Sequence, residues 1–119
     1  MKYVCLIYQD EAAVQKMSKE EMDKVSADYR AFMESIQKSG QLVKSQGLSS
    51  VHNATVVRVR DGKTLTTDGP YAETKEQLGG MCVIEARDLN EAIAVAAKIP
   101  SARFGCIEVR PEGWKIGEQ

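Results

Sequence analysis

One long amphipathic helix with a marked beginning and end constrains this chain more than any other feature. Ser18 and Glu21 have the spacing of a capping box, in which each side chain satisfies a free amide of the first helical turn. Gly40 suits the left-handed conformation that often ends a helix, so the signals predict a helix over residues 18–39. Apolar side chains recur between them at three- and four-residue steps and form one stripe on a charged helix: Met22, Val25, Tyr29, Phe32, Met33 and Ile36.

The dipeptide Asp61-Gly62 separates two β-rich runs, Ala54–Arg60 and Lys63–Thr67. This arrangement is typical of a hairpin with a type I′ turn, because both central residues of that turn need positive φ. We expect a dry face that carries Val57 and Val59, and a wet face that carries the basic side chains. Asp68 then points to the dry side, and the predicted facing pairs are Val59 with Thr64, Val57 with Thr66, Thr55 with Asp68, Arg58 with Leu65, and Arg60 with Lys63.

The remaining runs complete an α+β pattern. A second helix is predicted after Asp88, with Glu91 at the capping-box position and Pro100 as its stop; its apolar side is expected to hold Ala92, Ile93, Ala96 and Ala97. Two helices between antiparallel strands, on one face of the sheet, predict a ferredoxin-like sandwich. We expect a homodimer, because the other sheet face is left bare. The further expected strands are Lys2–Tyr8, Leu42-Val43, Gly80–Arg87 and Cys106–Arg110.

Length and composition exclude several classes of protein. A chain of 119 residues predicts a single domain over 1–119. With 16 Lys+Arg against 17 Asp+Glu, it lacks the basic surplus that direct nucleic-acid binding needs. No apolar run approaches the roughly 18 residues of a membrane span, and the apolar start is too short for a signal peptide. The expected location is therefore the cytoplasm, away from membranes.

Cysteine and histidine usage predicts no metal and no cofactor. The odd count of three cysteines, without a C-x-x-C pair, argues against a disulfide framework and a zinc site. Cys5, Cys82 and Cys106 all lie in strand-like runs, where a free thiol behaves as a small buried hydrophobe more often than as a nucleophile. His52, the sole histidine, is interpreted as an exposed loop residue in preference to a catalytic one.

The segment 68–80 is the most unusual part of the chain, because it combines a carboxylate, a fixed turn and an alternating charge run. Asp68 either builds its own turn or serves a ligand or a proton transfer. An Asx-turn would use the amide two residues on, which Pro70 does not have. Gly79-Gly80 is interpreted as a backbone device, since it lacks the spacing of a phosphate-binding loop. The candidate ligand-binding residues are Pro70, Tyr71, Glu73, Lys75 and Glu76.

Tyr29 is the second candidate, in the middle of the apolar stripe. One interpretation is a core tyrosine bonded to backbone; the other places Tyr29 and Asp68 together as catalytic residues. A phenol is a poor base at neutral pH, so in that pair Asp68 is the base or anchor and Tyr29 donates to a polarised oxygen.

These residues resemble the YCII-related proteins of the DGPF-domain group. The resemblance spans nearly the whole chain and rests above all on Asp68-Gly69-Pro70-Tyr71-Ala72-Glu73-Thr74-Lys75-Glu76, with Tyr71 where the group has Phe. It implies a bacterial protein with a dimeric ferredoxin-like α/β-barrel fold. It also implies a His-Asp pair, but the family histidine falls on Tyr29, so a histidine-based mechanism does not carry over.

Two functional hypotheses follow. The first is a small-molecule pocket between helix 18–39 and the loop 68–80, in which Asp68→Ala removes ligand binding while the fold survives. Whether such a pocket catalyses a reaction is left open. The second is a non-enzymatic partner-binding module, since some members of the resembled group are encoded beside sigma factors; it predicts a specific, sigma-factor-related protein partner. A cofactor-free oxygenase on the same architecture is an analogy from fold alone.

Overall fold

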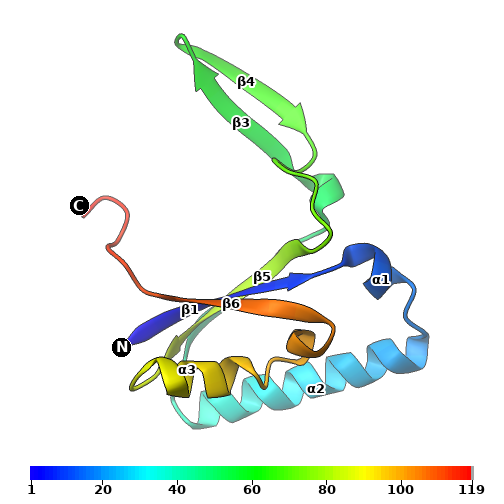
Figure 1. Ribbon diagram of the computed structural model, residues 1–119, viewed down its shortest axis with the longest axis vertical. Helices are drawn as coiled ribbons and strands as arrows, with labels where there is room; N and C mark the ends of the chain where they lie inside the picture. The colour runs from blue at the N-terminus through cyan, green and yellow to red at the C-terminus, as the bar shows by residue number, and fades with distance from the viewer. Residues whose placement is uncertain (119) are drawn as a thin grey trace.

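A four-stranded antiparallel sheet forms the centre of the computed structural model, which describes residues 1–118. Its strands are β1 (Lys2–Gln9), β2 (Leu42–Gly47), β5 (Gln77–Glu85) and β6 (Gly105–Pro111), and they lie side by side in the order β2-β5-β1-β6. Every neighbouring pair is antiparallel. With one long helix after β1 and another after β5, this α+β arrangement is consistent with the expected ferredoxin-like sandwich (Figure 1).

The long helix α2 (Lys19–Lys38) begins and ends where its sequence signals predict. The Ser18 hydroxyl accepts from the Glu21 amide, and the Glu21 carboxylate accepts from the Ser18 amide, so the capping box is complete. Gly40 has φ of 76°, the left-handed value that ends the helix. Phe32 and Ile36 from the predicted stripe are buried against the sheet.

The second long helix, α3 (Leu89–Ala96), has the predicted cap but a different buried face. Asp88 accepts from the amide of Glu91, whose side chain accepts in turn from the Arg87 amide. The expected apolar side is wrong in part: Ile93 is 50% exposed, and Ala97 is exposed beyond the helix. The helix is rotated so that its inner face consists of Ala92, Val95 and Ala96.

Three short helical turns have no counterpart in the sequence-based prediction. α1 (Glu11–Gln15) is capped by Asp10, and η2 (Pro100–Arg103) starts at the proline that stops α3. The third turn, η1 (Val51–Asn53), is hydrogen-bonded to α1: the Glu11 carboxylate accepts from the Ser50 hydroxyl and from the Val51 amide. These turns are too short for a periodic pattern to reveal them.

A hairpin of β3 (Thr55–Arg60) and β4 (Lys63–Asp68) forms its own two-stranded sheet and projects away from the body as an arm (Figure 1). The predicted facing pairs are confirmed, and both Asp61 and Gly62 have positive φ. The expected dry face is not confirmed within the chain, since Val57 is 61% and Val59 59% exposed. Local chemistry determines the pairing, but no other segment of residues 1–118 covers the arm.

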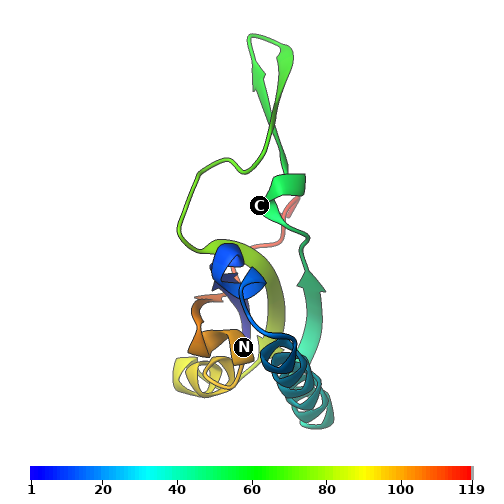
Figure 2. The same cartoon turned by 90° about the vertical axis from the view of Figure 1, so that its right-hand side faces the viewer.

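The core lies between the four-stranded sheet and the two long helices, which share one side of that sheet (Figure 2). Cys5 and Cys82 are buried in this core, as predicted. The prediction is wrong for Cys106, whose strand position directs it away from the helices and leaves it exposed. Among residues 1–118, no helix has both the length and the apolar character needed to cross a bilayer.

Candidate functional site

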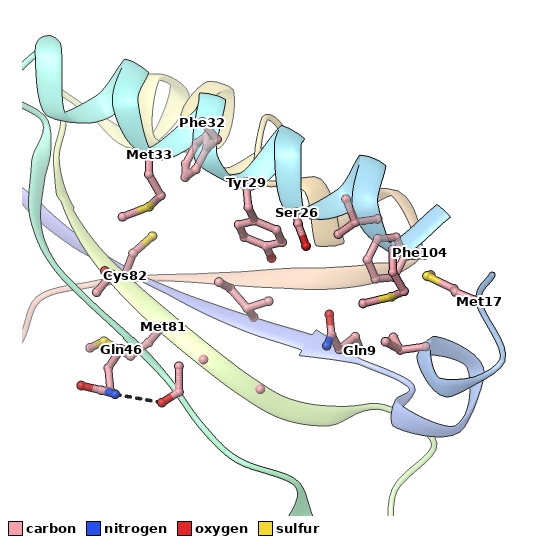
Figure 3. Close-up of a pocket in the computed structure, with 18 residues that line it drawn as sticks. Gln9, Met17, Ser26, Tyr29, Phe32, Met33, Gln46, Met81, Cys82 and Phe104 are labelled. Carbon is pink, nitrogen blue, oxygen red and sulfur yellow. Dashed lines mark hydrogen bonds between the residues drawn. The ribbon is translucent and has the colours of Figure 1, made fainter. Parts of the chain in front are cut away.

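A cavity of about 530 Å³ lies between α2 and the sheet, at the end where β2 and β5 lead toward the arm. This volume falls within the range of roughly 300–1,000 Å³ that is common for small-molecule sites. The lining is mostly apolar and includes four methionines and two phenylalanines (Figure 3). The lining residues are Ile7, Gln9, Val14, Met17, Met22, Val25, Ser26, Tyr29, Phe32, Met33, Ser45, Gln46, Gly47, Gly79, Gly80, Met81, Cys82 and Phe104.

The polar groups of the cavity include a hydrogen-bond relay from three different elements. The Tyr29 hydroxyl from α2 bonds to Ser101 Oγ from η2, and Ser101 Oγ donates to Gln9 Oε1 at the end of β1 over 2.9 Å. Because Ser101 uses its proton toward Gln9, Tyr29 is the donor in the first bond. Ser101 is 0% exposed, so the relay is anchored inside the protein and fixes both cavity side chains.

The protonation of Tyr29 follows from its position. Burial raises the pKa of this phenol, because a phenolate loses its hydration there, and hydrogen bonding with Ser101 offsets the rise in part. Tyr29 is therefore a neutral hydroxyl at physiological pH. It serves as a hydrogen-bonding group and not as a base.

The side-chain amide of Gln9 presents an uncommitted donor to the cavity. Its oxygen is used by Ser101, while Nε2 has no hydrogen-bond partner among residues 1–118. Gly79 lies beside it, where an added Cβ would be 3.8 Å from Nε2. A ligand oxygen placed at this end can accept from Gln9 while its carbon skeleton packs on the methionines.

The structure places the two predicted catalytic residues apart. Tyr29 lines the cavity, whereas Asp68 is exposed at the end of β4 on the arm and does not line it. No hydrogen bond joins the Asp68 carboxylate to another group in the described part of the chain, so neither the turn-building role nor the pairing with Tyr29 has support there. Only Gly79 and Gly80 of segment 68–80 contribute to the lining.

The other predicted ligand-binding residues also lie outside this cavity. Tyr71 is 83% exposed, and Pro70, Glu73 and Lys75 do not line it. Glu76 accepts a hydrogen bond from Cys106 at 3.5 Å and belongs to a shallower hollow with Tyr8 and Glu108. His52 is exposed in η1, as predicted. Within residues 1–118, no three His, Cys, Asp or Glu side chains gather as metal ligands.

Sequence reasoning missed Gln9 and Ser101. Strand alternation could have found Gln9, since Tyr3, Cys5, Ile7 and Gln9 share one face of β1. No local pattern marks Ser101. It is 92 residues from Gln9 and 72 from Tyr29, so only the folded chain brings the three together.

The fold and cavity define a small antiparallel α+β domain with an internal, largely apolar site. A profile of the YCII-related domain matches residues 1–111, and the chain belongs to this family. The expected family resemblance is thereby confirmed.

Two similar proteins extend this result. A protein of Rhizobium meliloti (strain 1021), named uncharacterized protein R00369, is 37% identical over 121 residues, covering 99% of this chain and 98% of the relative. The structure of 5-chloro-2-hydroxyhydroquinone dehydrochlorinase from Burkholderia phenoliruptrix AC1100, in complex with 2,5-dihydroxybenzoquinone, aligns with a TM-score of 0.58 at 12% identity and covers 100% of both chains. The structural likeness shows a shared fold, and neither similarity bears on a sigma-factor partner.

Proposed function

We propose that this YCII-related domain binds a small, mostly apolar molecule in the cavity between α2 and the sheet. The composition of the cavity lining is the main support for this proposal. Apolar side chains, including methionines and phenylalanines, line most of the cavity, while the Gln9 amide offers a hydrogen-bond donor beside the Tyr29–Ser101–Gln9 relay. Such a lining favours a ring or short chain with one hydrogen-bond-accepting oxygen. Flexible methionines adapt to ligand shape, which suits a site of this kind.

The structural neighbour supports the choice of a first ligand. Its complex holds 2,5-dihydroxybenzoquinone, a flat ring with oxygens at its edge. A ring of this size fits the cavity, and one of its edge oxygens can accept from Gln9 at the polar end. We therefore propose hydroxylated aromatic or quinone-like compounds as the ligand class, and binding rather than a particular reaction as the function.

Methionine-methyl NMR tests this proposal directly. The chain has five methionines, and three of those that line the cavity, Met17, Met22 and Met33, lie on or just before α2. Titration with 2,5-dihydroxybenzoquinone is expected to shift these three methyl signals. The signal of Met1, which is 69% exposed and outside the lining, serves as the internal reference. Shifts confined to Met1, or none at all up to millimolar ligand, would contradict the proposal for this ligand class.

Matched serine variants separate the cavity from the helix surface. Ser26 lines the cavity, while Ser35 lies on the opposite, exposed side of the same helix. Ser26→Phe is expected to fill the cavity and weaken binding about tenfold or more, a loss of at least about 1.4 kcal/mol. Ser35→Phe should leave binding unchanged. Asp68→Ala should also leave ligand binding unchanged. A loss of binding in this variant would show that the ligand binds at segment 68–80 and not in the cavity.

We further propose that the domain is a homodimer that buries the sheet face opposite the helices. Strand alternation places Val4, Leu6 and Tyr8 on that face, and the register puts Met81 beside Leu6. The arm supports the same proposal, because a lone two-stranded hairpin is marginally stable in water. A second copy that covers both surfaces would remove exposed apolar area from solvent.

A further inference from the structure

Two buried cysteines face each other across neighbouring strands. Cys5 on β1 and Cys82 on β5 are direct partners in the antiparallel register, and they are 0% and 3% exposed. Directly opposed residues of an antiparallel pair have Cα atoms about 4.5–5.5 Å apart. A disulfide spans Cα separations of about 4.4–6.8 Å. The backbone therefore already holds the two residues at a distance that a disulfide can bridge.

The two thiols differ in their access to the cavity. Cys82 lines it, and its sulfur points into the space below α2 (Figure 3). Cys5 is not among the lining residues and lies beside Cys82 on the neighbouring strand, within the core. A small molecule that enters the cavity therefore meets Cys82 first, with Cys5 in position to react second.

The interaction between the neighbouring thiols makes them chemically unequal. The Cys5 thiol lowers the pKa of Cys82, against the opposing effect of burial. The same interaction, together with burial and the charge on Cys82, raises the pKa of Cys5. Of the two thiols, Cys82, which the cavity exposes, is therefore the one that ionises first.

We propose that Cys5 and Cys82 form a dithiol site that reduces small neutral hydroperoxides entering the cavity. The Cys82 thiolate attacks the terminal peroxide oxygen, and the O–O bond breaks. The leaving alkoxide takes up a proton and departs as an alcohol, which leaves Cys82 as a sulfenic acid. The Cys5 thiol then attacks the Cys82 sulfur, and the sulfenic hydroxyl leaves with the thiol proton as water. The dithiol loses two electrons, the peroxide gains them, and an external thiol restores the reduced pair.

Cys106 provides an internal comparison. It is the exposed thiol of the chain and would oxidise first if access alone decided. Desolvation and the hydrogen bond from its Sγ to Glu76, 3.5 Å long, raise the pKa of Cys106 and so disfavour its thiolate. The proposal thus predicts an order of reaction opposite to the order of exposure, whether or not the cavity also binds an aromatic ligand.

The test treats the reduced, native protein with one equivalent of cumene hydroperoxide, an apolar and neutral probe. Remaining thiols are then alkylated under denaturing conditions, and the protein is digested with trypsin without reduction. Cleavage at Lys and Arg places Cys5 in peptide 3–16 and Cys82 in peptide 76–87. We expect these two peptides to be linked, with the loss of two hydrogens, while Cys106 is recovered alkylated. A second treatment after dithiothreitol should give the same product.

Variants separate the steps. Cys106→Ser should form the linked peptides as the wild type does. Cys5→Ser should stop at the sulfenic acid of Cys82, which dimedone traps, and Cys82→Ser should consume no peroxide beyond the level due to Cys106. Oxidation of Cys106 with Cys5 and Cys82 still reduced would overturn the proposal. The wild type and Cys106→Ser alone show which cysteines are oxidised. The test therefore does not depend on whether Cys5→Ser and Cys82→Ser fold.

Discussion

At the scale of single residues, the site depends on one buried serine. Ser101 accepts a hydrogen bond from Tyr29 and donates one to Gln9, so each hydroxyl in the relay has one defined direction. A buried polar group without a partner costs about 1–3 kcal/mol, and every fully buried side-chain nitrogen or oxygen within residues 1–118 has a hydrogen-bond partner. The relay therefore orients two side chains of the cavity without destabilising the core.

The raised pKa of Tyr29 predicts a loss of stability in alkali. Above its ordinary pKa of about 10, the unfolded chain releases this proton while the folded chain retains it. The folded state then binds more protons, so the free energy of unfolding falls as pH rises through this interval. Urea unfolding at about pH 8 and about pH 10.5 measures the fall. Tyr29→Phe should show a smaller fall than the wild type.

Tyr71→Phe is the matched control, because Tyr71 is 83% exposed. It should lose as much stability in alkali as the wild type does. An equal loss in Tyr29→Phe and Tyr71→Phe would contradict the assignment of this effect to the buried phenol.

At the scale of elements, local signals were sufficient where a few neighbouring residues determine the structure. Ser18 with Glu21, and Asp61 with Gly62, satisfy backbone requirements within a few residues, so their helix and turn are predictable from sequence. The Tyr29 relay and the Cys5–Cys82 pair arise only from contacts between distant segments, which no spacing rule reveals. The exposed arm shows the same limit: its pairing follows from sequence, but its position relative to the core does not.

Gly105 lies where β6 approaches β1 so closely that only glycine fits without moving the backbone. It pairs with Gln9 where β6 lies beside β1, and an added Cβ would be 2.0 Å from the carbonyl oxygen of Tyr8. Gly105→Ala must displace backbone, with an expected loss of about 1–3 kcal/mol in the free energy of unfolding. Gly113→Ala, where nothing lies within 4 Å, should change that free energy by less than about 0.5 kcal/mol. Urea denaturation measures the free energy of unfolding of both variants. Equal values would show that β1 can move away from an added Cβ without loss of stability.

At the scale of the whole molecule, the distribution of covered and uncovered surface is uneven. The two long helices cover one side of the sheet, while no helix of residues 1–118 packs on the other side and the arm is largely exposed (Figure 2). Glu108 and Arg110 pair with each other at 3.1 Å on that uncovered side, beside the apolar residues of β1. An apolar centre with charged residues at its edge is the usual composition of a protein interface.

The proposed homodimer can be tested by one substitution at the centre of this face. Leu6 lies between Met81 and Glu108 in the strand register. Leu6→Glu would place a carboxylate in the interface beside another acid, a burial that is unfavourable without a cationic partner. Sedimentation equilibrium should give twice the chain mass of 13.1 kDa for the wild type and the single-chain mass for Leu6→Glu. Ala31→Glu, on the exposed side of α2, makes the same charge change and should remain dimeric. A folded Leu6→Glu variant that still has the dimer mass would exclude this sheet face as the interface and leave the arm as the remaining contact surface.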